Sequence, residues 1–155
     1  MKGNEKLITK LNELLADELT AISQYMVHSE MCDNWGYEKL HKAIEGQAKE
    51  EMLHAEWLIK RILFLEGTPM MAKLNPIKIG KTVLEMVTVD ENSELGAIQA
   101  YNAGIGLAGE VADQSSADLL TQILKMEEAH ADWDRIQRTQ IDHLGLQNYL
   151  ANQAG

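Results

Sequence analysis

The stretch EEMLHAEWL, residues 50–58, places an acid and an imidazole on the same face of a predicted helix. Glu51 and His54 are three residues apart, which is the spacing of neighbouring side chains on a helical surface. Leu58 continues the same stripe, so the stripe is turned either toward water or toward an apolar core. The rest of the chain decides between these two possibilities.

Helical periodicity extends over most of the chain. Apolar residues recur at intervals of three and four, and no segment is typical of a strand, which predicts an all-α fold. The predicted helices occupy residues 4–33, 36–66, 82–112, 115–144 and 146–153. Gly67 is expected to supply the left-handed residue that ends the second helix.

Helices of this length must pack side by side to cover their apolar stripes, which predicts a four-helix bundle with a short fifth C-terminal helix. Two connections are short and require antiparallel neighbours, whereas the connection 67–81 has 15 residues and holds both prolines. At about 3.3 Å per residue, this connection can run the length of a helix. The second and third helices are therefore predicted to be parallel and joined by a long crossover.

Composition limits the class of protein. With 155 residues, the chain is expected to form a single domain, residues 1–155. Its one cysteine excludes an intramolecular disulfide and a tetracysteine metal site. The chain has no signal-peptide core or membrane-spanning run, so a soluble cytoplasmic protein without a membrane partner is expected. The net charge of −10 argues against nucleic-acid binding and favours a field that concentrates cations.

The two halves of the chain correspond when the sequence is aligned with itself at an offset of 76 residues. The matched polar residues are Glu18 with Glu94, Tyr25 with Tyr101, Glu51 with Glu127 and His54 with His130. Together with the crossover, this repeat predicts a pseudo-two-fold axis that brings the mid-helix acids and imidazoles to one level. A further Glu-x-x-His pair, Glu38 and His41, has no counterpart in the second half.

The stripes that carry the repeated acids are otherwise apolar, so we expect these carboxylates to point inward. Buried charges are normally paired or coordinate metals. Four glutamates and two neutral histidines cannot compensate one another, whereas two divalent or trivalent cations can. Mixed carboxylate and imidazole ligands suit iron or manganese, and this arrangement over four helices is the pattern of di-iron bundles. The six candidate ligands are Glu18, Glu51, His54, Glu94, Glu127 and His130.

Two tyrosines, Tyr25 and Tyr101, each lie seven residues beyond a repeated glutamate, two turns along the same face. Their hydroxyls are candidates to bond the ligand carboxylates, to donate an electron during the reaction, or to be satisfied elsewhere in the core. Trp57 and Trp133 are expected to pack within the bundle.

The motifs NELLADELTAISQY, NWGYEKLHKAI, EEMLHAEWLIKRILFLEGTP, KMEEAHADW and GLQNYLA resemble those of the bacterioferritins, over essentially the whole chain. The resemblance implies a ferritin-like fold and a 24-subunit hollow cage, built from two-fold dimers. It also implies a ferroxidase that oxidises Fe(II) with O2 or H2O2 and stores the mineral inside. The six candidate ligands would then bind two iron ions per subunit, with Glu51 and Glu127 bridging them.

Met52 follows Glu51 by one residue and therefore points away from the metal stripe, toward a flank of the bundle. An outward methionine usually packs into an interface. The resemblance implies instead that Met52 is an axial ligand of a b-type haem shared between two subunits. Candidate apolar walls for the haem are Leu19, Ile22 and Met26. A small iron–sulfur ferredoxin is a candidate reductant of the stored iron.

Three other functions stay open at this point. A di-iron peroxidase or oxidase would use the same ligands without storing mineral, although a rubrerythrin-like enzyme needs a Cys-x-x-Cys module that one cysteine cannot form. A haem electron-transfer bundle would store no mineral, and a metal-free helical adaptor would bind no iron. These functions differ in iron binding, in ferrous oxidation and in assembly size.

Overall fold

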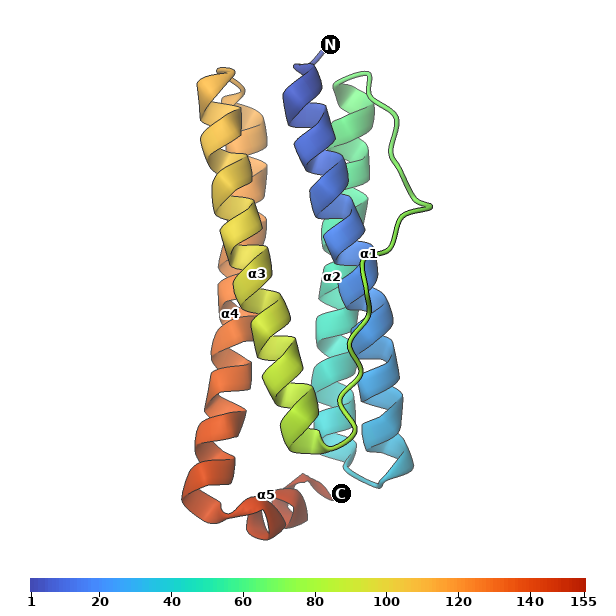
Figure 1. The fold of residues 1–155 in the computed structure, drawn as a ribbon, viewed down its shortest axis with the longest axis vertical. Helices are drawn as coiled ribbons and strands as arrows, with labels where there is room; N and C mark the ends of the chain where they lie inside the picture. The colour runs from blue at the N-terminus through green and yellow to red at the C-terminus, as the bar shows by residue number, and fades with distance from the viewer.

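The computed structural model describes residues 1–155 and contains five α-helices and no strand. The helices are α1 (Glu5–Asn34), α2 (Glu38–Phe64), α3 (Val83–Glu110), α4 (Gln114–Leu144) and α5 (Leu146–Gln153). None of them is both long and apolar enough to span a membrane. In Figure 1, α1 to α4 stand side by side, α5 lies across the lower end, and the crossover descends along the outside, so that α2 and α3 are parallel. The predicted four-helix bundle with a long crossover and a short fifth helix is confirmed.

Polar side chains begin three of the long helices. Asn4 accepts a hydrogen bond from the N–H of Leu7 at the start of α1, and Thr82 and Asp113 cap α3 and α4 in the same way. Such caps satisfy backbone donors that have no partner within the helix and contribute about 1 kcal/mol each. These helices start within one residue of the predicted positions, whereas the uncapped α2 starts two residues late, at Glu38.

The end of α2 differs from the prediction. The left-handed residue is Glu66, with a φ of 61°, and not Gly67, so the helix ends at Phe64. Gly67 is needed for a different reason, because a Cβ there would lie 2.7 Å from Cγ2 of Ile8 on α1. The glycine therefore lets the crossover approach α1 closely. The third helix also ends two residues earlier than predicted.

Two apolar clusters fill the bundle above and below its middle. The upper cluster includes Leu11 and Leu58, and the lower cluster includes Met86; all three side chains are fully buried. Trp57 packs on the upper cluster and Trp133 on the lower one, as predicted. Burial of a leucine or methionine side chain contributes about 1.5–3 kcal/mol. The mid-helix level between these clusters is left to polar residues.

Side chains spaced four residues apart on α1 hold the crossover. The bonds run from backbone N–H groups of the crossover to α1 side chains: Asn75 to Thr20 at 2.8 Å, Lys78 to Gln24 at 3.1 Å and Gly80 to His28 at 2.9 Å. Because backbone donors packed against a protein need acceptors, this ladder fixes the path of the crossover over α1.

Candidate metal centre

The six repeated acids and histidines converge at the middle of the bundle. α1 supplies Glu18, α2 supplies Glu51 and His54, α3 supplies Glu94, and α4 supplies Glu127 and His130. Each is at most 4% exposed. They form two overlapping groups whose candidate ligand atoms lie within 4.8 Å of one another. The first group contains Glu18 and His54, the second contains Glu94 and His130, and both contain Glu51 and Glu127.

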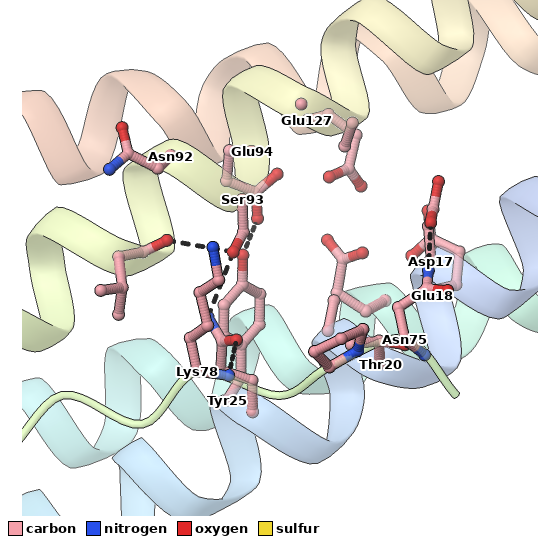
Figure 2. A pocket seen from close by; sticks show the side chains of 17 residues that line it. Asp17, Glu18, Thr20, Tyr25, Asn75, Lys78, Asn92, Ser93, Glu94 and Glu127 are labelled. Carbon is pink, nitrogen blue, oxygen red and sulfur yellow. Dashed lines mark hydrogen bonds between the residues drawn. The ribbon is translucent and has the colours of Figure 1, made fainter.

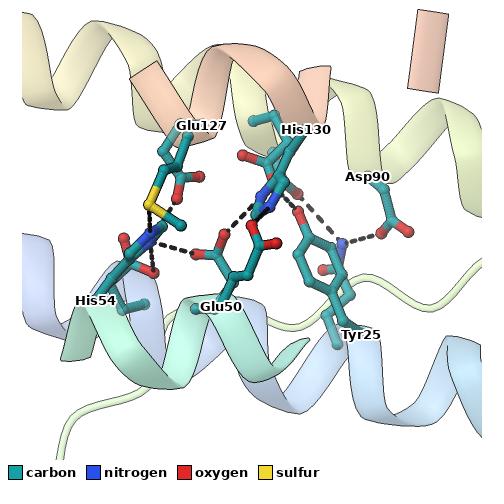
Figure 3. A network of polar contacts seen from close by, with 12 residues as sticks. Tyr25, Glu50, His54, Asp90, Glu127 and His130 are labelled. Carbon is teal, nitrogen blue, oxygen red and sulfur yellow. Dashed lines mark hydrogen bonds and ion pairs between the residues drawn. The ribbon is translucent and has the colours of Figure 1, made fainter. Parts of the chain in front are cut away.

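The two histidines connect the halves of the repeat. Nδ1 of His54 lies 2.8 Å from Oε1 of Glu127. Nδ1 of His130 lies 2.9 Å from Oε1 of Glu51. Figure 3 shows both rings facing the same central space from α2 and α4, and their centroids are 6.4 Å apart. Each histidine thus approaches the shared carboxylate of the opposite half, as the pseudo-two-fold axis predicts.

Each of the six residues keeps one buried polar atom without a hydrogen bond. These atoms are Oε2 of Glu18, Oε1 of Glu51, Nδ1 of His54, Oε2 of Glu94, Oε1 of Glu127 and Nδ1 of His130. The two Nδ1 atoms lie close to carboxylate oxygens, but these contacts lack the alignment of a hydrogen bond. Buried polar atoms normally have partners, so six such atoms without a hydrogen bond in one place need an explanation. Two bound metal ions fit this set of carboxylates and imidazoles.

The charges of the site are strongly perturbed. Burial, followed by the charge of Glu51, raises the pKa of Glu18 well above its usual range, and burial raises the pKa of Glu94 to about 8. Burial opposes the charged form of both histidines, but the adjacent carboxylates raise the pKa of His54 to about 12 and that of His130 to about 11. Burial also disfavours ionised Glu51, but its close contacts with Glu18, His130 and His54 hold its pKa at about 2. At neutral pH, a cation that entered this site would therefore compete with protons for it.

Tyr25 and Tyr101 are both buried and bond to carboxylates of the site. The hydroxyl of Tyr25 donates to Oε1 of Glu94, and the hydroxyl of Tyr101 donates to Oε1 of Glu18 at 2.5 Å. Burial, followed by the charge of the adjacent glutamate, raises the pKa of both tyrosines, so both keep their protons. Of the roles left open by the sequence, the structure supports carboxylate bonding. Each bond leaves the second oxygen of its glutamate free to face the centre.

A cavity of about 530 Å³ extends from the surface to this site, between α1, α3 and the crossover. Its buried end is lined by Glu18, Glu51, Glu94 and Glu127. The other end is lined by more exposed polar residues, among them Asn75, Lys78, Asn92 and Ser93. Figure 2 shows the side chains of both helices around this space. The cavity offers small hydrophilic ions a path to the glutamates.

A second buried polar group next to the site was not predicted. Asp90 on α3 accepts a hydrogen bond from Nε2 of Gln24 at 2.8 Å and lies 3.0 Å from Nδ1 of His28. Since Nε2 of His28 accepts from the N–H of Gly80, the ring proton is on Nδ1 and is donated to Asp90. Asp134 on α4 is also buried, and burial, followed by the charge of Asp90, raises its pKa to about 9. Asp90 and Asp134 each lie four residues from a candidate ligand, and the corresponding residues of the other half are leucines. A comparison of the two halves could therefore have identified both acids.

Met52 does not join the central group. It is 50% exposed on the outward side of α2, and Met26 on α1 is exposed to a similar degree. Leu19 and Ile22 are partly buried and pack against the upper apolar cluster. The exposed thioether is therefore available to a partner outside this chain.

The fold and the site define a ferritin-like four-helix bundle with a paired carboxylate and histidine centre. Residues 8–144 match the Ferritin-like domain family. The chain is 42% identical over 154 residues to the Bacterial ferritin of Synechocystis sp., which covers 99% of both chains. It is 40% identical over 149 residues to the Bacterioferritin of Rhodobacter capsulatus, covering 96% of this chain and 92% of that relative. The Bacterioferritin of Mycobacterium bovis is 38% identical over 151 residues, covering 97% and 95%. The chain therefore belongs to the bacterioferritins of the ferritin family.

Proposed function

We propose that this chain is a ferroxidase that takes up Fe(II) as its substrate, oxidises it with O2 or H2O2 and stores the Fe(III) mineral inside a homo-oligomeric cage. The observation that carries the proposal is the set of six buried oxygen and nitrogen atoms without hydrogen bonds, which belong to two groups with shared carboxylates. When both histidines are neutral, four buried carboxylates need compensating charge, and two ferrous ions supply it.

In this proposal, all six converging residues are ligands. One Fe(II) ion binds Glu18 and His54, the other binds Glu94 and His130, and Glu51 and Glu127 bridge the two. Glu51 and Glu127 belong to both groups, which supports their bridging role. Tyr25 and Tyr101 orient the two terminal glutamates through their hydroxyls, and this fixed orientation favours ligation by the remaining oxygen.

Two ferrous ions held side by side give up one electron each, so the oxidant receives a pair of electrons. With H2O2, two Fe(II) ions and two protons yield two Fe(III) ions and two water molecules. With O2, two Fe(II) ions and two protons yield two Fe(III) ions and one H2O2. The buried carboxylates favour the more highly charged product, and the low-dielectric surroundings strengthen this effect. The polar cavity between α1 and α3 is the proposed path of Fe(II) to the site.

The larger assembly also belongs to the proposal. Each chain is a single domain, and 24 copies, arranged as two-fold dimers, form a cytoplasmic cage whose iron is released by a small iron–sulfur ferredoxin. The half-exposed thioether of Met52 would hold a haem together with the same residue of a second copy across a two-fold axis. Leu19, Ile22 and Met26 provide apolar surroundings on α1. A b-type haem bound there would supply one-electron transfer.

The test is an anaerobic Fe(II) titration followed by addition of oxygen. We expect two Fe(II) ions per chain and a fast oxidation phase in the wild type, and loss of this phase in Glu18→Ala with assembly size unchanged. Glu38→Ala is the matched control, because Glu38 has the same spacing to a histidine but lies on the surface, where it pairs with Lys42 at 2.9 Å. A fast phase that survives Glu18→Ala refutes the ligand assignment.

The same preparation separates storage from the alternatives. Iron in large excess over two ions per chain that elutes with the cage supports mineral storage. Fast oxidation without retained iron supports a di-iron peroxidase or oxidase instead, and bound haem without ferrous oxidation supports an electron-transfer bundle.

A further inference from the structure

The pseudo-two-fold axis allows the ligands of one half of the centre to be compared with those of the other half. Toward the centre, the two halves match, because each terminal glutamate accepts from a tyrosine and each histidine turns Nδ1 inward. The outer ring nitrogens do not match. The residues that contact them, Glu50 and Met126, are counterparts at the offset of 76.

The outer contacts differ in chemistry. Nε2 of His130 lies 2.7 Å from Oε2 of Glu50, whose side chain is 48% exposed. Nε2 of His54 lies 3.2 Å from the Sδ of Met126. Figure 3 shows both contacts: the carboxylate of Glu50 at the ring of His130, and a sulfur atom at the ring of His54. One histidine thus has a charged acceptor and the other has a thioether.

This difference changes how each ring binds a cation. When Nδ1 is a ligand, the ring proton is on Nε2 and needs an acceptor. A carboxylate makes a strong, charge-assisted hydrogen bond that orients the ring and raises the basicity of the ligating nitrogen. A thioether sulfur is only a weak acceptor, so His54 gains little of either effect.

We infer that the two metal positions are inequivalent: the position of Glu94 and His130 binds first and more tightly, with Glu50 as a positioning residue for His130. The position of Glu18 and His54 fills second. A chain with one Fe(II) ion cannot supply an electron pair, so the weaker position sets the Fe(II) concentration at which two-electron oxidation begins. This inference rests on the proposed function.

The test is an anaerobic titration with Co(II), in which binding is measured by calorimetry and by ligand-field absorption. The wild type should bind two ions in two steps whose Kd values differ by about 10- to 100-fold. Glu94→Ala should remove the tighter step and Glu18→Ala the weaker one. Two equal steps in the wild type, or the reverse assignment, would overturn the inference.

Variants at the outer contacts test the cause. Glu50→Gln should weaken only the tighter step, by about tenfold, while Glu56→Gln, an exposed glutamate of the same helix, should leave both steps unchanged. Met126→Glu should tighten only the weaker step, so that the two steps merge. Equal shifts of both steps in Glu50→Gln would mean a general structural effect and contradict the inference. Binding of no Co(II) at all would overturn the proposed metal centre as well, whereas two equal sites would leave that centre intact.

Discussion

Loading of the centre with two divalent ions should release about four protons per chain at pH 7. Both histidines must lose a proton to ligate through Nδ1, and their pKa values, raised to about 12 and about 11, keep them protonated beforehand. Burial raises the pKa of Glu94 to about 8 and that of Glu18 well above its usual range, so burial favours the protonated form of both. Two divalent ions carry as much positive charge as these protons, so the exchange leaves the charge of the buried site unchanged.

The release can be measured by adding two equivalents of Zn(II) to the metal-free protein in weak buffer with a pH indicator. The pKa values are raised, so the site holds its protons more tightly than free side chains do, and lower pH favours protons over metal. The overall constant for two ions should therefore change by roughly 10⁴-fold per pH unit near pH 7. Glu38→Ala should release as many protons as the wild type. Release of one proton or fewer, or an affinity independent of pH between about 6 and 8, would refute the reasoning.

Three further changes test the surroundings of the centre. Leu58→Ala removes a fully buried side chain from the upper cluster and should lower the free energy of unfolding by about 2–5 kcal/mol, measured in denaturant; a loss below about 1 kcal/mol would contradict tight packing there. Asp90→Asn replaces one of the two carboxylate oxygens that contact Gln24 and His28, which in turn accept from the N–H groups of Lys78 and Gly80. Amide hydrogen exchange at Lys78 and Gly80 should therefore accelerate about tenfold. Unchanged protection of these amides would show that Asp90 does not support the crossover. Met52→Leu should abolish haem absorbance after reconstitution but leave the ferrous oxidation phase intact, and retained haem would exclude Met52 as its ligand.

The convergence of the six polar residues could be predicted because an inward carboxylate conflicts with its apolar stripe. Glu18 alone would be ambiguous, but its repetition at Glu94, together with a duplicated Glu-x-x-His, leaves metal binding as the consistent interpretation. The structure brings these residues together, and their binding of iron stays a prediction.

Contacts between elements were less predictable. Gly67 was expected to end α2, but its missing Cβ is needed where the crossover meets Ile8, and Glu66 adopts the left-handed conformation instead. The offset of 76 pairs Glu50 with Met126, yet their contacts with opposite histidines depend on ring orientations that no sequence pattern encodes.

The polar residues beside the centre follow from the topology of the chain. The pseudo-two-fold axis does not relate the crossover to another segment, because the chain has a single crossover. Its backbone N–H groups need acceptors, which Gln24 and His28 provide, and the counterparts of these residues in the second half are alanine and glycine. Their donor groups then face α3 and require Asp90, whose counterpart is a leucine. The internal repeat therefore identifies the candidate metal ligands, which occur in both halves. It does not identify the residues that bind the crossover, because the crossover occurs only once.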